Sequence, residues 1–176
     1  MLQPIPEDGD VPNPLAAIMA DKQSLPGKVF GNPPRPPSVA NTRRWRGAEI
    51  PSSNGHGSAR GIAKVHAALA GGGESAGVRL MSGTTVDEAR KERVAAKAVI
   101  LGMTYAVRLG TCFRSPSLAT HEGRAHSGTQ AWEGSMGYAD PEHQIGFAYV
   151  MNQMGPAIDT RSASLSRALY RAVQER

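Results

Sequence analysis

One hairpin-like segment near the C-terminus constrains the fold of this 176-residue chain more than any other feature. Two apolar stretches, GSMGYA (134–139) and QIGFAYVMNQM (144–154), flank the sequence DPEH, in which Asp140 and Pro141 are the residue types that favour a turn. The second stretch is long and apolar enough to be a central strand. The sequence therefore predicts a β-hairpin as part of an antiparallel sheet.

Two helices are predicted ahead of this hairpin. The first spans the segment SARGIAKVHAALAGGG (58–73), which begins with a capping serine, Ser58, and ends in three glycines that stop a helix. Its larger apolar residues, Ile62, Val65 and Leu69, recur at helical spacing. Beside them lies a face of small residues suited to close packing, which consists of Ala59, Ala63 and Ala70. The second helix is predicted from Thr84 to about Val94, with Thr84 and Asp87 at a spacing like that of a capping box.

A third helix is predicted at the C-terminus, over residues 159–175. Apolar residues recur there at i, i+3, i+4, i+7 and i+8, which is typical of a core-facing stripe. The apolar stripe consists of Leu165, Ala168, Leu169, Ala172 and Val173. The predicted solvent face consists of Arg161, Arg167, Arg171 and Gln174.

The order of elements predicts the fold class. Residues 1–57 form a proline-rich, irregular lead segment with one short helix from about Pro14 to Asp21, and residues 99–113 are rich in β-branched and aromatic side chains that favour strands. Helices followed by antiparallel strands and a last helix indicate an α+β fold, with the sheet flanked by helices. A sheet of about three strands leaves edges and faces to cover, so we expect this fold to be incomplete.

Composition narrows the classes of partner. The net charge of +5 is spread along the chain, and its only dense basic cluster surrounds Trp45, so we expect neither nucleic-acid binding nor a membrane partner. The single cysteine, Cys112, permits no disulfide within the chain and no cysteine-based metal site. The N-terminal sequence has no apolar signal-peptide core, and a cytoplasmic location is the default expectation.

The serine and histidine spacings do not match those of known nucleophile or metal sites. Ser135 stands in EGSMG, where the glycine frame of a nucleophile elbow is wrong and a strand follows, and no serine in the chain has lysine three positions later. None of the five histidines forms a His-x-x-x-His pair, so no metal site is expected. The glycine-rich stretch IPSSNGHGSARG (50–61) lacks the lysine of a P-loop, and a tight turn before the helix is the favoured interpretation.

The stretches AEIPSSNGHGSARGIAKVHAALAGGG (48–73), VRLMS (78–82) and HSG…WEGSMGYADPEHQIGFAYVMNQM (126–154) together resemble the serine β-lactamase-related family. This family includes class C-like β-lactamases and penicillin-binding-protein-like esterases. The resemblance implies that residues 58–176 are the C-terminal part of a β-lactamase-like domain, an antiparallel sheet flanked by helices. The implied activity is serine hydrolysis of an ester, amide or β-lactam-type acyl group, without a cofactor.

The resemblance also implies a role for one strand. The family has a Lys-Thr-Gly or His-x-Gly motif on a strand that lines the substrate cleft, and His126, Ser127 and Gly128 match it. The backbone N–H after the glycine, that of Thr129, would complete the oxyanion hole, where one donor is worth about 3–4 kcal/mol. Between this motif and the serine of the hairpin, the chain is longer than the family pattern by about three residues, a difference that can shift a strand register.

The family's nucleophile is missing from this sequence. Neither Ser-x-x-Lys nor Tyr-x-Asn or Tyr-x-Ser occurs, and the family places both N-terminal to the region seen here. The chain is therefore interpreted as a C-terminal fragment with no catalytic residue of its own, which acts on a small acyl-type substrate only when a missing N-terminal part completes it. The alternative is a non-catalytic pseudoenzyme or partner-binding remnant, with self-association through exposed sheet edges.

Overall fold

The structure is a computed structural model that describes residues 21–32, 37–51, 55–100, 104–108, 127–130, 134–152 and 161–175. The helix predicted from about Pro14 to Asp21 lies outside these residues except for Asp21 itself. The described helices are α2 (Leu25–Gly31), the 3-10 helix η1 (Pro37–Asn41), α3 (Arg43–Arg46), α4 (Ala59–Ala70), α5 (Gly83–Arg90) and α6 (Arg161–Gln174). The described strands are β1 (Glu74–Ser75), β2 (Val78–Arg79), β3 (Glu92–Lys97), β4 (Thr104–Arg108), β5 (Ser127–Gln130), β6 (Met136–Asp140) and β7 (Ile145–Tyr149).

A three-stranded antiparallel sheet with the order β5-β6-β7 is the centre of this α+β fold. The predicted hairpin is confirmed as β6 and β7, with Asp140 opposite Ile145 at its closed end. The prediction of β7 as a central strand is wrong for the described strands, since β6 is central and all five of its residues are buried. β3 and β4 form a separate antiparallel ribbon, and so do β1 and β2.

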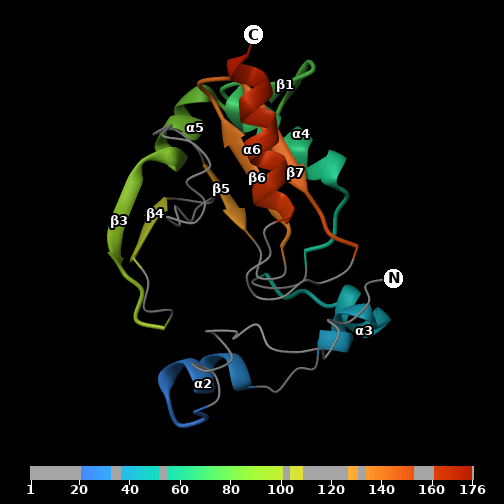
Figure 1. The fold of residues 1–176 in the computed structure, drawn as a ribbon, viewed down its shortest axis with the longest axis vertical. Coiled ribbons are helices and arrows are strands. Elements are labelled where there is room, and N and C mark those ends of the chain that lie inside the picture. The colour runs from blue at the N-terminus through green and yellow to red at the C-terminus, as the bar shows by residue number, and fades with distance from the viewer. Residues whose placement is uncertain are drawn as a thin grey trace.

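Helices cover both faces of this sheet, with α6 on one side and α4 on the other (Figure 1). Successive residues of a strand point to opposite faces. On β6, the Tyr138 hydroxyl reaches Ser166 of α6 at 2.8 Å, whereas Gly137 lies against His66 of α4. The alternation of a small residue with an aromatic one on β6 therefore lets a helix pack closely on one face and fills the core on the other.

α4 approaches the sheet through small residues, as the sequence predicts. A Cβ atom on Gly146 of β7 would collide with the backbone nitrogen of Ala67 and would lie 2.6 Å from the carbonyl oxygen of Ala63. Val65, in the apolar set predicted for this helix, instead leaves 49% of its surface exposed. The alanine face faces the sheet because only small residues allow two backbones to come this close.

The prediction for α6 is confirmed for its solvent face, since Arg161, Arg167, Arg171 and Gln174 are all exposed, but its packed face differs in part from the predicted stripe, of which only Leu169 and Val173 are partly buried. The buried residues of α6 are Ser162, Ser166 and Tyr170, whereas Leu165, Ala168 and Ala172 of the predicted apolar stripe are exposed. The physical reason is that β6 presents the Tyr138 hydroxyl and the carboxylate of Asp140, and buried polar groups need hydrogen-bonding partners. Polar residues of α6 supply those partners.

The helix predicted from Thr84 to about Val94 is confirmed as α5, which begins one residue earlier, at Gly83, but the prediction is wrong at its C-terminal end. Ser82 caps α5, its hydroxyl oxygen accepting from the amide of Thr85 at 3.1 Å, and the helix ends at Arg90. Residues 92–97 form β3, which pairs with β4. Pairing with a neighbouring strand overrides the helical propensity of the sequence ERVAAK.

Replacing Gly146 with alanine is expected to destabilise the chain by about 1–3 kcal/mol, because the new methyl group overlaps backbone atoms of α4 that cannot move independently. Gly31→Ala is the matched control, since nothing lies within 4 Å of its added methyl group. Urea unfolding followed by circular dichroism measures both. Equal unfolding midpoints for the two variants would contradict the close approach of α4 and β7.

Candidate functional site

Two of the three residues that match the third motif, Ser127 and Gly128, lie on strand β5. Ser127, Gly128 and Thr129 are consecutive on it and pair with Ala139, Tyr138 and Gly137 of β6, respectively. His126, the first residue of the motif, lies outside the described residues. The roles of these four residues in a substrate cleft and an oxyanion hole remain predictions.

Gly128 has a physical role in this pairing. A Cβ atom at this position would lie 2.5 Å from the carbonyl oxygen of Gly137 and would collide with the side chain of Tyr138. Only glycine therefore fits between β5 and the aromatic residue opposite. This explains why a glycine follows Ser127, and it fixes where the backbone of Thr129 lies along β6.

His66 supports the same part of the sheet from the side of α4. Its side chain is only 8% exposed, and its Nε2 lies 2.7 Å from where a Cβ of Gly137 would be, so the ring packs directly against β6. Gly137 is the register partner of Thr129. The position of His66 beside the partner of Thr129 depends on tertiary contacts and is visible only in the structure.

The imidazole of His66 is kept neutral by its surroundings. Burial lowers its pKa from the usual 6.5, because the charged form loses its hydration. Its Nδ1 is buried and has no hydrogen-bond partner among the described residues. A buried polar nitrogen without a partner is costly, so this ring is a point where the packing of the described residues is incomplete.

A polar network holds the turn of the hairpin to α6. The carboxylate of Asp140 is fully buried and accepts hydrogen bonds from the Tyr170 hydroxyl at 2.7 Å and from the backbone amides of Glu142 and His143 at 2.9 and 3.2 Å. Nδ1 of His143 lies 2.8 Å from the same carboxylate. These donors compensate for the burial of a charge that would otherwise be strongly unfavourable.

The tyrosines of this network remain protonated, and Tyr170 donates to Asp140. Burial is the main cause that raises the pKa of both Tyr138 and Tyr170, and for Tyr170 the hydrogen bond to the Asp140 carboxylate raises the pKa further. Tyr138 also stacks on Phe147 with ring centroids 4.9 Å apart. Neither hydroxyl is therefore suited to accept a proton at neutral pH, and both are bound within the core.

Ser135, which the sequence excludes as an elbow nucleophile, lies just before β6. Its hydroxyl donates to the sulfur of Met151, and its oxygen accepts from the amide of Met151 at 3.4 Å. This serine thus joins the two arms of the hairpin. Its contacts agree with the interpretation that Ser135 has a structural role.

Among the described residues, no group of three or more histidine, cysteine, aspartate or glutamate side chains converges to hold a metal ion. In the same part of the chain, no helix has the length and apolar character needed to cross a bilayer.

A helix-flanked antiparallel sheet with a His-Ser-Gly sequence entering the strand beside the hairpin is the arrangement expected of β-lactamase-type hydrolases. The β-lactamase family model matches residues 11–172, which is most of the chain. The protein therefore belongs to the β-lactamase family, in which β-lactamase-like serine hydrolases and esterases are grouped, and the recognition made from the sequence is confirmed.

Named relatives agree with this assignment. The chain is 31% identical over 107 residues to the esterase/beta-lactamase LipL of Mycobacterium tuberculosis, covering 61% of this chain and 24% of LipL. A solved family VIII carboxylesterase is 37% identical with a TM-score of 0.75, and the match covers 81% of this chain and 39% of the carboxylesterase chain. A penicillin-binding protein homologue from Caulobacter crescentus is 29% identical with a TM-score of 0.71, covering 98% and 43%.

A more distant structure shares the fold alone. EstA from Arthrobacter nitroguajacolicus Rue61a is 22% identical with a TM-score of 0.74, covering 99% of this chain and 46% of EstA. The chain thus spans less than half the length of each of these relatives. The α+β fold with an antiparallel sheet flanked by helices is that of β-lactamase and penicillin-binding-protein relatives.

His66 is expected to make stability depend on pH. Its pKa is lower in the folded chain than in the unfolded chain, so the unfolded chain binds a proton first as the pH falls below about 6.5. Its contribution is therefore fully present above that pH and is lost as the pH falls towards the folded pKa. Urea midpoints at pH 8 and pH 5.5 should differ more for the wild type than for His66→Leu, and an equal difference would contradict a buried neutral ring.

Tyr170→Phe is expected to destabilise the chain by about 1.5–3 kcal/mol, because it removes a hydrogen bond to a buried carboxylate. Tyr149→Phe is the control, since it removes a phenolic hydroxyl from β7 outside this network and should cost less. Thermal and urea unfolding measure both. A loss no larger for Tyr170→Phe than for Tyr149→Phe would show that the network contributes little.

Proposed function

We propose that this chain is the C-terminal part of a serine hydrolase that transfers an acyl group from an ester, amide or β-lactam-type substrate, and that it is inactive alone. The observation that carries the proposal is the combination of a third-motif strand with the absence of Ser-x-x-Lys and of Tyr-x-Asn or Tyr-x-Ser from all 176 residues. The chain would supply one wall of the substrate cleft, and the rest of the fold would supply the nucleophile.

The proposed chemistry assigns distinct roles to the two parts. A serine of the remaining part would attack the acyl carbonyl carbon, while one base, its lysine assisted by its tyrosine, accepts the hydroxyl proton and later passes it to the leaving group. The negative charge that develops on the carbonyl oxygen would be stabilised by the backbone N–H of Thr129 on β5, and His126 would orient the substrate. The leaving group then departs, and water hydrolyses the acyl-enzyme.

The packing around β5 supports this assignment. An oxyanion donor is effective only when it is held in place before the reaction, so that no reorganisation is needed. Gly128 sits where a side chain would collide with Tyr138, and Gly137 opposite Thr129 is backed by His66. Each of these contacts restricts how the backbone of Thr129 can shift relative to β6.

A non-catalytic role is the second candidate. Among the described strands, β5 and β7 each end the sheet, and an unpaired strand edge is a template for another strand. A remnant of the fold could use such an edge to bind a partner or a second copy of itself. This role predicts a well-folded chain that never supports acyl transfer, even with the remaining part of the fold present.

The purified chain is expected to show no turnover of a chromogenic ester or cephalosporin and no labelling by a fluorophosphonate probe, because it has no activated serine. An intact family VIII carboxylesterase is the positive control for both assays. Mass spectrometry of the probe-treated chain gives the decisive measurement. Covalent labelling of any serine in these 176 residues, together with turnover, would disprove the proposal.

A further inference from the structure

The ring of His66 is wedged between α4 and the middle of β6. Where a Cβ atom of Gly137 would lie, Nε2 of His66 is 2.7 Å away, and Cδ2 of His66 and Cγ2 of Ile62 are both 3.0 Å away. Ile62 and His66 are four residues apart, so they lie on the same face of α4. Together they form the surface against which the backbone of β6 packs at Gly137.

α4 cannot move away from this contact without disturbing β7. Ala63 and Ala67 lie three residues before and one residue after His66 on the helix. A Cβ atom on Gly146 of β7 would collide with the backbone of Ala67 and would lie 2.6 Å from the carbonyl oxygen of Ala63. The ring of His66 therefore has a fixed support, and its size sets the spacing between α4 and β6.

Tyr138 restricts β5 from the other face of the sheet. A side chain at Gly128 would collide with that of Tyr138, whose hydroxyl lies 2.8 Å from the Ser166 hydroxyl of α6. Gly128 pairs with Tyr138, and Thr129 pairs with Gly137. The two residues of β6 that set the register at Thr129 are thus each held by a helix, Tyr138 by α6 and Gly137 by α4.

The contact that His66 makes with β6 is one of shape. Its side chain is only 8% exposed, and Nδ1 has no hydrogen-bond partner among the described residues. Because side chains alternate along a strand, the faces that β6 and β7 turn to α4 carry no ionisable group; they consist of Gly137, Ala139, Gly146 and Ala148.

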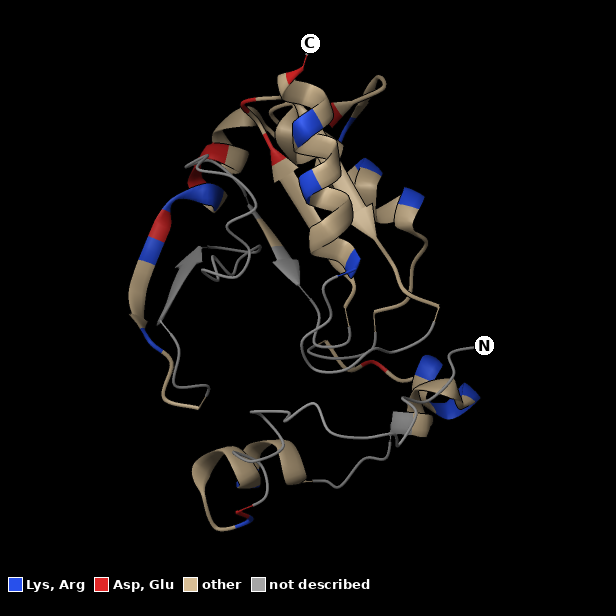
Figure 2. Cartoon of the chain, in the orientation of Figure 1, with Lys and Arg blue, Asp and Glu red and all other residues tan. Residues whose placement is uncertain are grey.

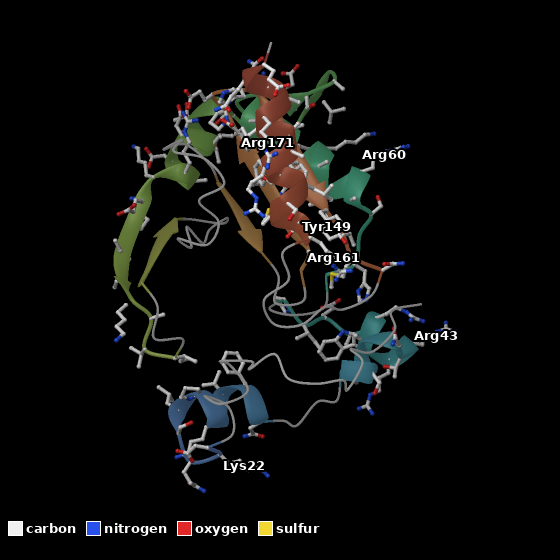
Figure 3. All side chains as sticks on the ribbon, viewed as in Figure 1. Lys22, Arg43, Arg60, Tyr149, Arg161 and Arg171 are labelled. Carbon is white, nitrogen blue, oxygen red and sulfur yellow. The ribbon has the colours of Figure 1, made fainter. Side chains whose placement is uncertain are left out.

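The charges near α4 do not face the ring either. Arg60 and Lys64 are exposed, and Figure 2 shows the positive charge of α4 on its outer side. Figure 3 labels Arg60, whose side chain points away from the sheet. Beyond the end of the helix, Glu74 of β1 is paired with Arg79. Volume, not charge, is therefore what His66 contributes to this part of the sheet.

We propose that His66 is a positioning residue for acyl transfer: its ring holds Gly137 in place, and the pairing of β5 with β6 passes this constraint to the backbone amide of Thr129. In this role His66 touches neither the substrate nor the reacting atoms. The inference rests on the proposed function, in which that amide is an oxyanion donor. A displacement of about 1 Å at such a group can cost on the order of 100-fold in rate.

The test is a graded series of His66 variants of the full chain, isotope-labelled for NMR. Alanine removes the ring, valine replaces only its base, and the δ-carbons of leucine reach about as far as Cδ2 of His66. The amide chemical shift of Thr129 is expected to change most in His66→Ala, less in His66→Val and least in His66→Leu. The amide of Thr42, beside α3, is the internal reference and should move in none of them.

The series separates packing from other causes. All three variants abolish the ring current of the imidazole, so equal Thr129 shifts in all of them would overturn the positioning role. If His66→Ala does not give a folded spectrum, the comparison of His66→Val with His66→Leu decides alone. Because Nδ1 has no partner to lose, His66→Leu is also expected to keep a urea midpoint close to that of the wild type at pH 8.

Val86→Ala is the matched control for lost stability. Val86 is an apolar residue of α5 that is 5% exposed, so its truncation should lower the urea midpoint as His66→Ala does. The Thr129 amide should nevertheless stay where it is in the wild type. A Thr129 shift as large in Val86→Ala as in His66→Ala would show that His66 acts only through general stability, and would overturn the proposal.

These outcomes are distinct from those that test the proposed function. None of the NMR measurements needs turnover, so an unmoved Thr129 amide overturns the positioning role even in a chain that belongs to an active hydrolase. Covalent labelling of a serine in this chain, with turnover, would overturn the proposed function instead. The coupling between His66 and Thr129 would then stand as a property of the packing.

Discussion

The buried carboxylate of Asp140 is the group on which the rest of the described fold depends. It lies at the closed end of the β6–β7 hairpin, and its donors come both from the turn itself and from Tyr170 of α6, 30 residues further along the chain. A charge buried without these partners would be strongly unfavourable, so satisfying it fixes the turn and the rotation of α6 together. That rotation places Ser162, Ser166 and Tyr170 of α6 against the sheet and leaves Leu165, Ala168 and Ala172 exposed.

The opposite face of the sheet follows a different rule, because α4 is held by close approach of backbones rather than by polar groups. Gly146 and Gly137 leave no room for a side chain, and α4 meets them with Ala67 and His66. The strand β5 lies beside this tightly packed region, and its Thr129 pairs with Gly137. The strand that resembles a cleft wall is thus held in a framework that two helices fix from both sides.

How much of this could be predicted depends on whether a signal is local. The hairpin, α4 and the presence of α6 follow from turn residues, caps and helical period in short windows of sequence. The orientation of α6 does not, because Ser162, Ser166 and Tyr170 recur at helical spacing just as the apolar stripe does, and only partners on β6 decide between the two. Likewise, the motif on β5 is legible in the sequence, but the place of His66 beside the partner of Thr129 depends on tertiary contacts.

The contact between α4 and β7 joins segments separated by nearly half the chain. The entropy lost in closing such a loop grows slowly with its length, by about 0.6 kcal/mol for each doubling. Residues can therefore be gained or lost within the interval at little thermodynamic cost. The sequence leading into the hairpin, where this chain exceeds the family pattern, falls in that interval. Evolution can thus remodel the sequence that leads into the hairpin while the helix-and-sheet framework stays constant.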